Sequence, residues 1–155
     1  MARVLVGPED FDVGAEMAAL VRGRTDIGGI GCFVGTVRAF SGGRDLAAMT
    51  LEHYPGMTEH AVARIAEEAE QRWSLLGCTV IHRVGRLVPG ANIVLVLAAA
   101  SHRQAALAAT AFLIDWLKTR APFWKCEEFA AGGVSWVAAR DEDDAAAGRW
   151  DEAGA

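Results

Sequence analysis

Two lysines that lie close together in the sequence are the residues best suited to chemistry. The chain has thirteen arginines but only two lysines, Lys118 and Lys125, which flank the segment Thr119-Arg120-Ala121-Pro122-Phe123-Trp124. If Lys118 ends a helix and Lys125 lies in the following strand, the intervening proline turn brings both ammonium groups to one cavity. Neighbouring cations lower each other's pKa, and a partly neutral amine can act as a nucleophile or general base. The alternative is two solvated lysines, one of them favourably placed at a helix C-terminus.

Three further residues are candidate ligands for an anion. Ser101-His102-Arg103 opens a predicted helix directly after a predicted strand. His102 and Arg103 therefore stand where free backbone N–H groups favour phosphate. Arg38 ends an earlier strand and precedes a glycine-rich segment. The alternatives are an N-cap serine followed by ordinary polar residues, and a solvated surface arginine.

The sequence contains no familiar motif for a metal or a nucleotide cofactor. His53, His60 and His82 complete the histidines, and they do not form H-E-x-x-H or another metal-binding spacing. G-x-G-x-x-G, G-x-x-x-x-G-K-[ST] and G-x-S-x-G are absent as well. The three cysteines are far apart without a C-x-x-C pair, which favours buried, reduced thiols. We expect no catalytic metal and no bound cofactor.

Length and charge favour a small intracellular protein. With 155 residues, 52% of them hydrophobic, the chain is long enough for one substantial core, so we expect a single domain over residues 1–155. A formal charge of −5 disfavours nucleic acid and anionic membranes as partners. The first residues lack the long apolar stretch that is typical of a secretory signal, and no apolar run approaches the roughly 20 residues of a membrane span. We therefore expect a cytoplasmic location.

Hydrophobic periodicity and turn residues predict an α+β fold with a mostly antiparallel sheet and about three helices. The first helix is expected at 11–22. The second should begin with Thr58 as its N-cap and stop at Gly77, and the third should span 102–119 and end before Pro122. Strands are expected at 2–6, 28–38, 46–54, 78–84 and 92–99, followed by a hairpin of 122–128 and 134–139. Residues 39–45 have loop chemistry, 92–99 is apolar enough to be central, and the acidic tail 141–155 is expected to be helical or frayed.

Several motifs in the same order resemble the large, catalytic subunit of molybdopterin synthase, and the similarity spans about residues 28–150. The motifs are Phe33-Val34-Gly35-Thr36-Val37-Arg38, Leu51-Glu52-His53-Tyr54-Pro55-Gly56-Met57-Thr58-Glu59, His82-Arg83-Val84-Gly85-Arg86-Leu87, Ser101-His102-Arg103 and Asp115-Trp116-Leu117-Lys118-Thr119-Arg120-Ala121-Pro122-Phe123-Trp124-Lys125.

The resemblance implies an α/β hammerhead-type fold and a homodimer that binds two small ubiquitin-like sulfur-carrier subunits, a heterotetramer. It implies sulfur transfer, without a metal, from the carrier's C-terminal Gly-Gly thiocarboxylate to cyclic pyranopterin monophosphate, which forms the dithiolene of molybdopterin. It also implies that Lys118 lies nearest the carrier terminus, that Lys125 is the second pocket lysine, and that Arg38, His102 and Arg103 hold the anionic substrate.

Two positions depart from the family pattern. Ala91 follows Pro89-Gly90 where an acidic residue is common, and Cys126 places a thiol next to Lys125. A persulfide on Cys126 is one hypothesis, although the sequence offers no second cysteine nearby. Two other functions remain open: a transferase or lyase acting on another phosphorylated small molecule, and a non-catalytic dimeric module that binds the carrier.

Overall fold

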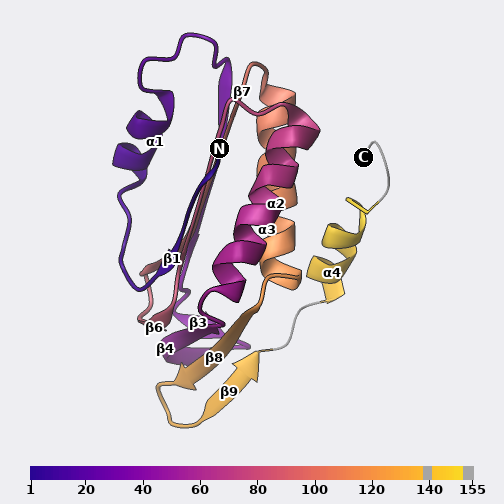
Figure 1. Ribbon diagram of the computed structural model, residues 1–155. Coiled ribbons are helices and arrows are strands. Elements are labelled where there is room, and N and C mark those ends of the chain that lie inside the picture. Colours follow the sequence, from indigo (N-terminus) through magenta and orange to yellow (C-terminus); the bar gives the residue numbers. More distant parts are fainter. Residues whose placement is uncertain (138–140, 152–155) are drawn as a thin grey trace.

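The computed structural model describes residues 1–137 and 141–151, which form two sheets and a set of flanking helices (Figure 1). The strands are β1 (Arg3–Gly7), β2 (Gly29–Thr36), β3 (Phe40–Ser41), β4 (Arg44–His53), β5 (Gly77–Arg83), β6 (Gly85–Leu87), β7 (Asn92–Ala100), β8 (Phe123–Phe129) and β9 (Val134–Val137). The helices are α1 (Val13–Val21), α2 (Met57–Trp73), α3 (Arg103–Thr119) and α4 (Asp141–Gly148). The expected α+β class is confirmed.

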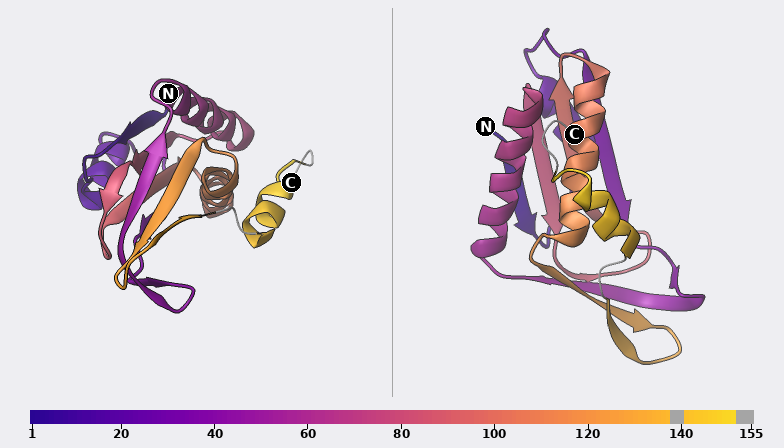
Figure 2. Two further views of the ribbon diagram at one scale, coloured as in Figure 1. Left: turned by 90° about the horizontal axis from the view of Figure 1, so that it is seen from below. Right: turned by 90° about the vertical axis from the view of Figure 1, so that its right-hand side faces the viewer.

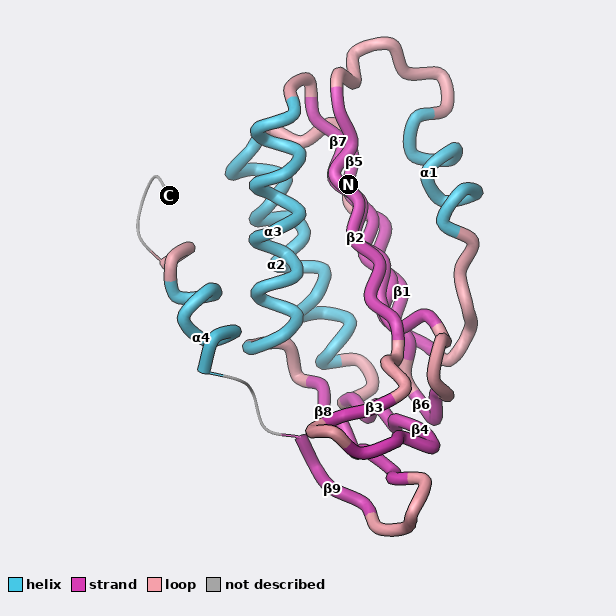
Figure 3. Tube along the Cα trace, turned by 180° about the vertical axis from the view of Figure 1, so that it is seen from behind, coloured by secondary structure: helices cyan, strands magenta, loops and turns pink. Residues whose placement is uncertain are grey.

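The larger sheet has the strand order β1-β5-β7-β2, and its pairs are antiparallel apart from β1 with β5. Helix α1 covers one face of this sheet, and α2 and α3 lie side by side on the other (Figures 1 and 3). Strand β7 is central and buried on both faces, as expected. Its Val94 and Val96 pack in the core beneath α2 and α3, whereas Leu95 and Leu97 pack with α1.

The second sheet has the order β3-β4-β8-β9, with β6 also paired to β4. It lies across one end of the larger sheet, near the C-terminal end of α3 (Figure 2). Strands β4 and β8 pair antiparallel from Leu46 with Phe129 to His53 with Phe123. Because α3 leads directly into β8, this arrangement brings the last turn of α3 next to the inner face of the second sheet.

Helix α3 packs closely on β2 because Gly31 has no side chain. A Cβ atom at Gly31 would lie 2.5 Å from the carbonyl oxygen of Ala106 in α3, which is too short for any real contact. The small residues Ala106 and Ala109 are buried along the same face of the helix. Glycine and alanine at this contact therefore set the distance between α3 and the sheet.

The structure corrects several boundaries. Residues 39–45, expected as a loop, form the β3–β4 hairpin around Gly42 and Gly43, whose φ angles of 58° and 76° suit a tight turn. Strand β6 was not predicted because three residues carry too little periodicity. The structure also has a fourth helix, α4, in the acidic tail. Residues 152–155 of this tail lie outside the described part of the chain. Residues 138 and 139 of the expected final strand lie outside it too.

The ends of α2 also differ from the prediction. Gly56, not Thr58, is the N-cap, and the Glu59 carboxylate accepts from the backbone N–H of Gly56. Thr58 is fully buried in the first turn, where its hydroxyl oxygen accepts from Tyr54 N at 3.0 Å. The helix ends at Ser74, which adopts the left-handed conformation at φ 49°, three residues before Gly77.

Candidate functional site

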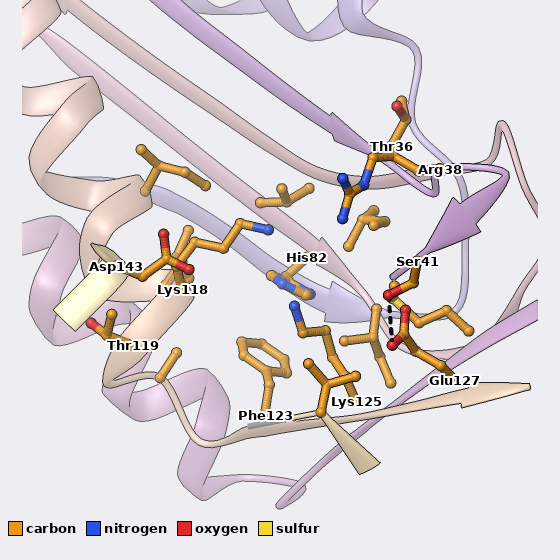
Figure 4. A pocket seen from close by; sticks show the side chains of 18 of the residues that line it. Thr36, Arg38, Ser41, His82, Lys118, Thr119, Phe123, Lys125, Glu127 and Asp143 are labelled. Atoms are coloured by element: carbon orange, nitrogen blue, oxygen red, sulfur yellow. Dashed lines mark hydrogen bonds between the residues drawn. The ribbon is translucent and has the colours of Figure 1, made fainter. Parts of the chain in front are cut away.

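A cavity of about 390 Å³ lies between the C-terminal end of α3 and the second sheet (Figure 4). This volume suits a small organic ligand. Its polar lining comes from β2 and the segment after it, from β3, β5, α3, β8 and α4. The polar residues are Thr36, Arg38, Ser41, His82, Lys118, Thr119, Lys125, Glu127 and Asp143.

Both lysines of the chain and Arg38 line this cavity. Lys118 reaches it from the last turn of α3 and Lys125 from β8, and Figure 4 shows their amines directed toward the same space. The guanidinium of Arg38 enters from the opposite side. Two cations from consecutive elements and a third from a distant segment therefore converge on one volume.

The environment of Lys118 lowers the pKa of its amine. The main cause is the desolvation of the amine by burial, although the residue as a whole is exposed. The charges of Lys125 and Arg38 lower the pKa further, whereas the carboxylate of Asp143 opposes them. A larger fraction of this amine is therefore neutral at a given pH than for a solvated lysine.

Strand alternation decides which side chains of β8 face the cavity. Phe123, Lys125 and Glu127 line it, whereas Trp124 lies on the other face and packs edge-on against Tyr54 at 4.6 Å between ring centroids. Cys126 does not line the cavity and pairs across the strands with Thr50 and Trp136. A persulfide role for Cys126 thus gains no support from its position.

Arg38 is held in place through the backbone of its neighbour. Val37 donates its N–H to the carbonyl oxygen of Ala91 at 2.9 Å and accepts from Gly90 N at 2.8 Å. Val37 itself is 3% exposed, so its side chain anchors this segment in the core. The backbone of residues 90 and 91 therefore holds the segment that precedes Arg38, and these bonds do not depend on the side chain at position 91.

A buried carboxylate balances part of the positive charge. Glu127 is 9% exposed, and its Oε1 accepts a hydrogen bond of 3.1 Å from the hydroxyl of Ser41 (Figure 4). This bond links β8 to the β3–β4 hairpin. Glu127 therefore fixes the hairpin that closes one side of the cavity and places a negative group near the cations.

His82 lies on the cavity floor between the two lysine amines (Figure 4). It is 6% exposed, and its ring stacks on Phe123 with 3.9 Å between centroids. Burial lowers the pKa of His82 to about 4, and the charges of Lys118, Lys125 and His53 act in the same direction. The imidazole is therefore neutral near pH 7 and adds no positive charge to the site.

His102 and Arg103 are not part of this cavity. They lie at the N-terminal end of α3, and both are exposed. Arg103 and Lys118 lie near opposite ends of this 17-residue helix, so they are separated by a rise of roughly 22 Å. His102, not Ser101, is the N-cap, without a capping side-chain hydrogen bond. One copy of the chain thus brings together three of the five predicted site residues.

The sequence did not single out His82, Ser41, Glu127 or Asp143 as site residues. His82 directly follows the apolar pair Val80-Ile81 near the end of its strand, and this pattern is a usable signal for a buried functional histidine. The sequence signal for Glu127 is weaker: strand alternation places its side chain on the same face of the strand as that of Lys125. Ser41 and Asp143 depend on the hairpin and on α4, whose positions follow from tertiary packing.

The cavity suits an anionic ligand held by charge-assisted hydrogen bonds. Within residues 1–137 and 141–151, no three His, Cys, Asp or Glu side chains group as metal ligands. Among the helices that the structure describes, none has the length and apolar character needed to cross a bilayer. Fold and site together define an α+β protein with a cavity on which three cationic side chains converge.

Comparison with known proteins identifies the family. The model of the MoaE protein family matches residues 6–120. A curated relative from Cereibacter sphaeroides, named molybdopterin synthase catalytic subunit, is 55% identical over 148 residues, 96% of this chain and 99% of that one. The chain belongs to the MoaE family, as its motifs predicted.

Solved structures agree with this assignment. The molybdopterin biosynthesis MoaE protein from Burkholderia ambifaria MC40-6 superimposes with a TM-score of 0.82 at 50% identity, covering 98% of this chain and 99% of that one. A protein-protein complex of subunits 1 and 2 of molybdopterin-converting factor from Helicobacter pylori 26695 has a TM-score of 0.65 at 18% identity, with 90% of each chain covered. At 18% identity, the similarity to the Helicobacter pylori complex shows a shared fold alone.

Proposed function

We propose that this chain is the catalytic subunit of a molybdopterin synthase and transfers sulfur to cyclic pyranopterin monophosphate. The donor is the C-terminal thiocarboxylate of a small ubiquitin-like carrier subunit, and two transfers complete the dithiolene. The observation that carries the proposal is the convergence of Arg38, Lys118 and Lys125 on one cavity. Family membership and relatives with this enzyme's name support it.

The charge of the site matches both reactants. A thiocarboxylate and a cyclic phosphate are anions, whereas the chain as a whole carries −5. An acidic protein can bind two anions together only where its basic groups are concentrated, as they are in this cavity. A Gly-Gly terminus suits a narrow entrance because it has no side chains. Binding both reactants in one cavity replaces a collision in solution by a unimolecular step.

The three cations have different roles in this proposal. Lys118, with its lowered pKa, is the residue for acid–base or transient nucleophilic work at the carrier terminus. Lys125 and Arg38 stabilise the negative charge that develops during transfer. Arg38 also binds the phosphate, because a guanidinium can donate two parallel hydrogen bonds to it.

His102 and Arg103 act in the pocket of a second copy. A rise of roughly 22 Å along α3 between Arg103 and Lys118 excludes them from the cavity of their own chain. The family resemblance implies a homodimer, and an antiparallel pair of α3 helices would bring the N-terminal end of one beside the C-terminal end of the other. With one carrier for each pocket, the assembly is a heterotetramer, and we place it in the cytoplasm.

One reconstitution tests the proposal against its alternatives. The chain is mixed with thiocarboxylated carrier and cyclic pyranopterin monophosphate, and molybdopterin is measured for wild type, Lys118→Ala and the control Arg64→Ala on the exposed face of α2. We expect product from wild type and the control, and a loss of about 10²-fold or more in Lys118→Ala.

Each alternative gives a different result. A non-catalytic carrier-binding module binds the carrier without product, and a transferase for another phosphorylated molecule turns over its substrate without carrier. Wild-type protein that makes no molybdopterin would contradict the proposed function. Full activity in Lys118→Ala would contradict the assignment of that lysine.

A further inference from the structure

Strand β2 leaves one long edge of the larger sheet open. It is the last strand in the order β1-β5-β7-β2, and no other strand within residues 1–137 and 141–151 pairs with its outer side. Figure 3 views the sheet from this side, with helices α2 and α3 on one face and α1 on the other. The opposite edge is the five-residue strand β1, whereas β2 has eight residues.

This edge lacks the features that normally keep edge strands from pairing. Its sequence, Gly-Ile-Gly-Cys-Phe-Val-Gly-Thr, contains neither a charged residue nor a proline. The one irregularity in its pairing with β7 lies at the far end, between Gly35 and Thr36. Free N–H and C=O groups along an apolar strand pair readily with another chain unless charges, prolines or bulges prevent it. The outer side of β2 is therefore suited to a partner strand.

The two ends of β2 lie beside the two groups of predicted site residues. At its start, a Cβ atom added to Gly29 would lie 3.5 Å from the Cα atom of Arg103, so this end contacts the first turn of α3. At its other end, Thr36 lines the cavity. The strand spans roughly 23 Å between these residues, which matches the rise along α3 from Arg103 to Lys118. An antiparallel neighbour of the same sequence would therefore bring its own Arg103 to this cavity.

We propose that two copies of the chain pair through β2, antiparallel and about a two-fold axis at Cys32, and that each copy completes the other's cavity with Arg103. The inference rests on the proposed function in that it takes this cavity as the catalytic one. The two four-stranded sheets then form one continuous sheet, with both α3 helices antiparallel on the same face. His102 reaches the cavity of the second copy together with Arg103.

The symmetry restricts the register of the two strands. A two-fold axis perpendicular to the sheet keeps every side chain on its own face, so a residue on the axis must lie opposite its own copy. The middle of β2 falls between Cys32 and Phe33, which leaves these two choices. With Cys32 on the axis, Ile30 lies opposite Val34 of the second copy, and both are apolar residues on the α1 face. With Phe33 on the axis, Ile30 would lie opposite Thr36, so apolar pairing favours Cys32.

A second copy fits this edge better than a strand of another protein. Any strand would satisfy the free backbone groups, but a foreign strand would leave Arg103 roughly 22 Å from Lys118. A two-fold contact uses one surface twice, and an uncharged strand with an apolar centre is complementary to itself. One contact therefore accounts for both the open edge and the distance of the basic residues from the cavity.

A charge on the axis tests the interface. Cys32 is exposed in the single chain, so Cys32→Lys should leave the fold of one copy intact, but pairing would place two ammonium groups opposite each other. Leu5→Lys is the matched control, because Leu5 is an exposed apolar residue of β1 at the other edge of the same sheet. In sedimentation equilibrium, we expect wild type and Leu5→Lys to be dimers and the dimer Kd to rise about 100-fold in Cys32→Lys. A monomeric wild type, or an unchanged Kd in Cys32→Lys, would overturn the proposal.

Oxidation of the wild-type dimer tests the register without a destabilising substitution. Opposite residues of antiparallel strands have Cα atoms about 4.5–5.5 Å apart, which is within the range that a disulfide spans. Mild oxidation catalysed by copper–phenanthroline should therefore link the two Cys32 thiols, and mass spectrometry of the peptides identifies the link. The variant Cys32→Ser should give no such product. A wild-type dimer whose Cys32 thiols do not link would overturn the pairing.

Inorganic phosphate tests the shared cavity separately from sulfur transfer. Measured by isothermal titration calorimetry, Arg103→Ala should weaken phosphate binding about tenfold in the dimer and have no effect in the monomeric Cys32→Lys background. An equal effect in both backgrounds, or no effect in the dimer, would overturn the inference. Failure of the proposed function would instead appear as a dimer that binds phosphate with the help of Arg103 but makes no molybdopterin.

Discussion

The hydroxyl of Thr58 donates a hydrogen bond of 3.1 Å to the carbonyl oxygen of Pro122. This bond joins the first turn of α2 to the turn between α3 and β8, which separates Lys118 from Lys125. Thr58 is fully buried, and the same hydroxyl accepts from Tyr54 N. One side chain outside the cavity thus holds the connection on which the spacing of the two lysine amines depends.

Replacing Thr58 by valine should destabilise the fold and loosen the site. Valine keeps the shape but removes the hydroxyl that pairs with the partly buried Tyr54 N–H and Pro122 carbonyl, at a cost of about 1–3 kcal/mol in the free energy of unfolding. Urea denaturation measures this cost, with Thr58→Ser as the control that keeps the hydroxyl. A valine variant as stable as wild type would show that water replaces both bonds.

Mixed dimers test whether Arg103 serves the other copy. Lys118→Ala and Arg103→Ala chains are each expected to be nearly inactive. In a mixed dimer, one pocket has both substitutions and the other has neither, so co-expression should restore activity through that intact pocket. If Arg103 acted in its own chain, each pocket of the mixed dimer would carry one substitution and activity would stay absent.

The charge of Lys125 should set part of the pKa of Lys118. Lys125→Met removes a repelling cation while keeping an unbranched side chain, so the pKa of Lys118 should rise toward the ordinary lysine value of 10.5. NMR of the single remaining lysine measures this shift. Arg22→Met, at the exposed end of α1, is the control. A Lys118 pKa that stays constant or falls would mean that the two amines do not interact.

His82 should make the fold sensitive to acid. Its pKa is about 4 in the folded protein against 6.5 for an ordinary histidine, so as the pH falls the unfolded chain binds this proton first. The contribution is fully present above pH 6.5 and is lost as the pH falls toward 4. It amounts to about 3 kcal/mol. Unfolding measured across this range should depend less on pH in His82→Gln, and an identical dependence in both proteins would contradict the burial argument.

The sequence predicted the lysine pair well because its geometry is local. Lys118 and Lys125 are separated by one turn, and Pro122 requires the helix to end before it. Helix and strand periodicity then place both side chains. The same reasoning placed the β7 segment at the centre of the sheet, since continuous apolar residues can only be buried on both faces.

The features that the sequence did not predict depend on contacts between distant segments. Nothing local could show that the end of α3 carrying His102 points away from the cavity, because that follows from the direction in which the helix crosses the sheet. Thr58 was taken for an N-cap because threonine commonly occupies that position, yet its hydroxyl is used by Pro122, 64 residues away. Residues 39–45 were read as a loop because two glycines serve a hairpin and an irregular segment equally well.

Helix α4 has a consequence for how the protein is produced. Asp143 from this helix lines the cavity and raises the pKa of Lys118. The helix is anchored to α3 by Asp115, which accepts from Arg149 at 2.9 Å and from the indole of Trp150 at 2.8 Å. A shortened form ending before α4 would retain both amines but lose Asp143, one of the two carboxylates that line the cavity. Affinity for simple phosphate could then increase while turnover declined, so binding strength would be a misleading guide to the quality of such a preparation.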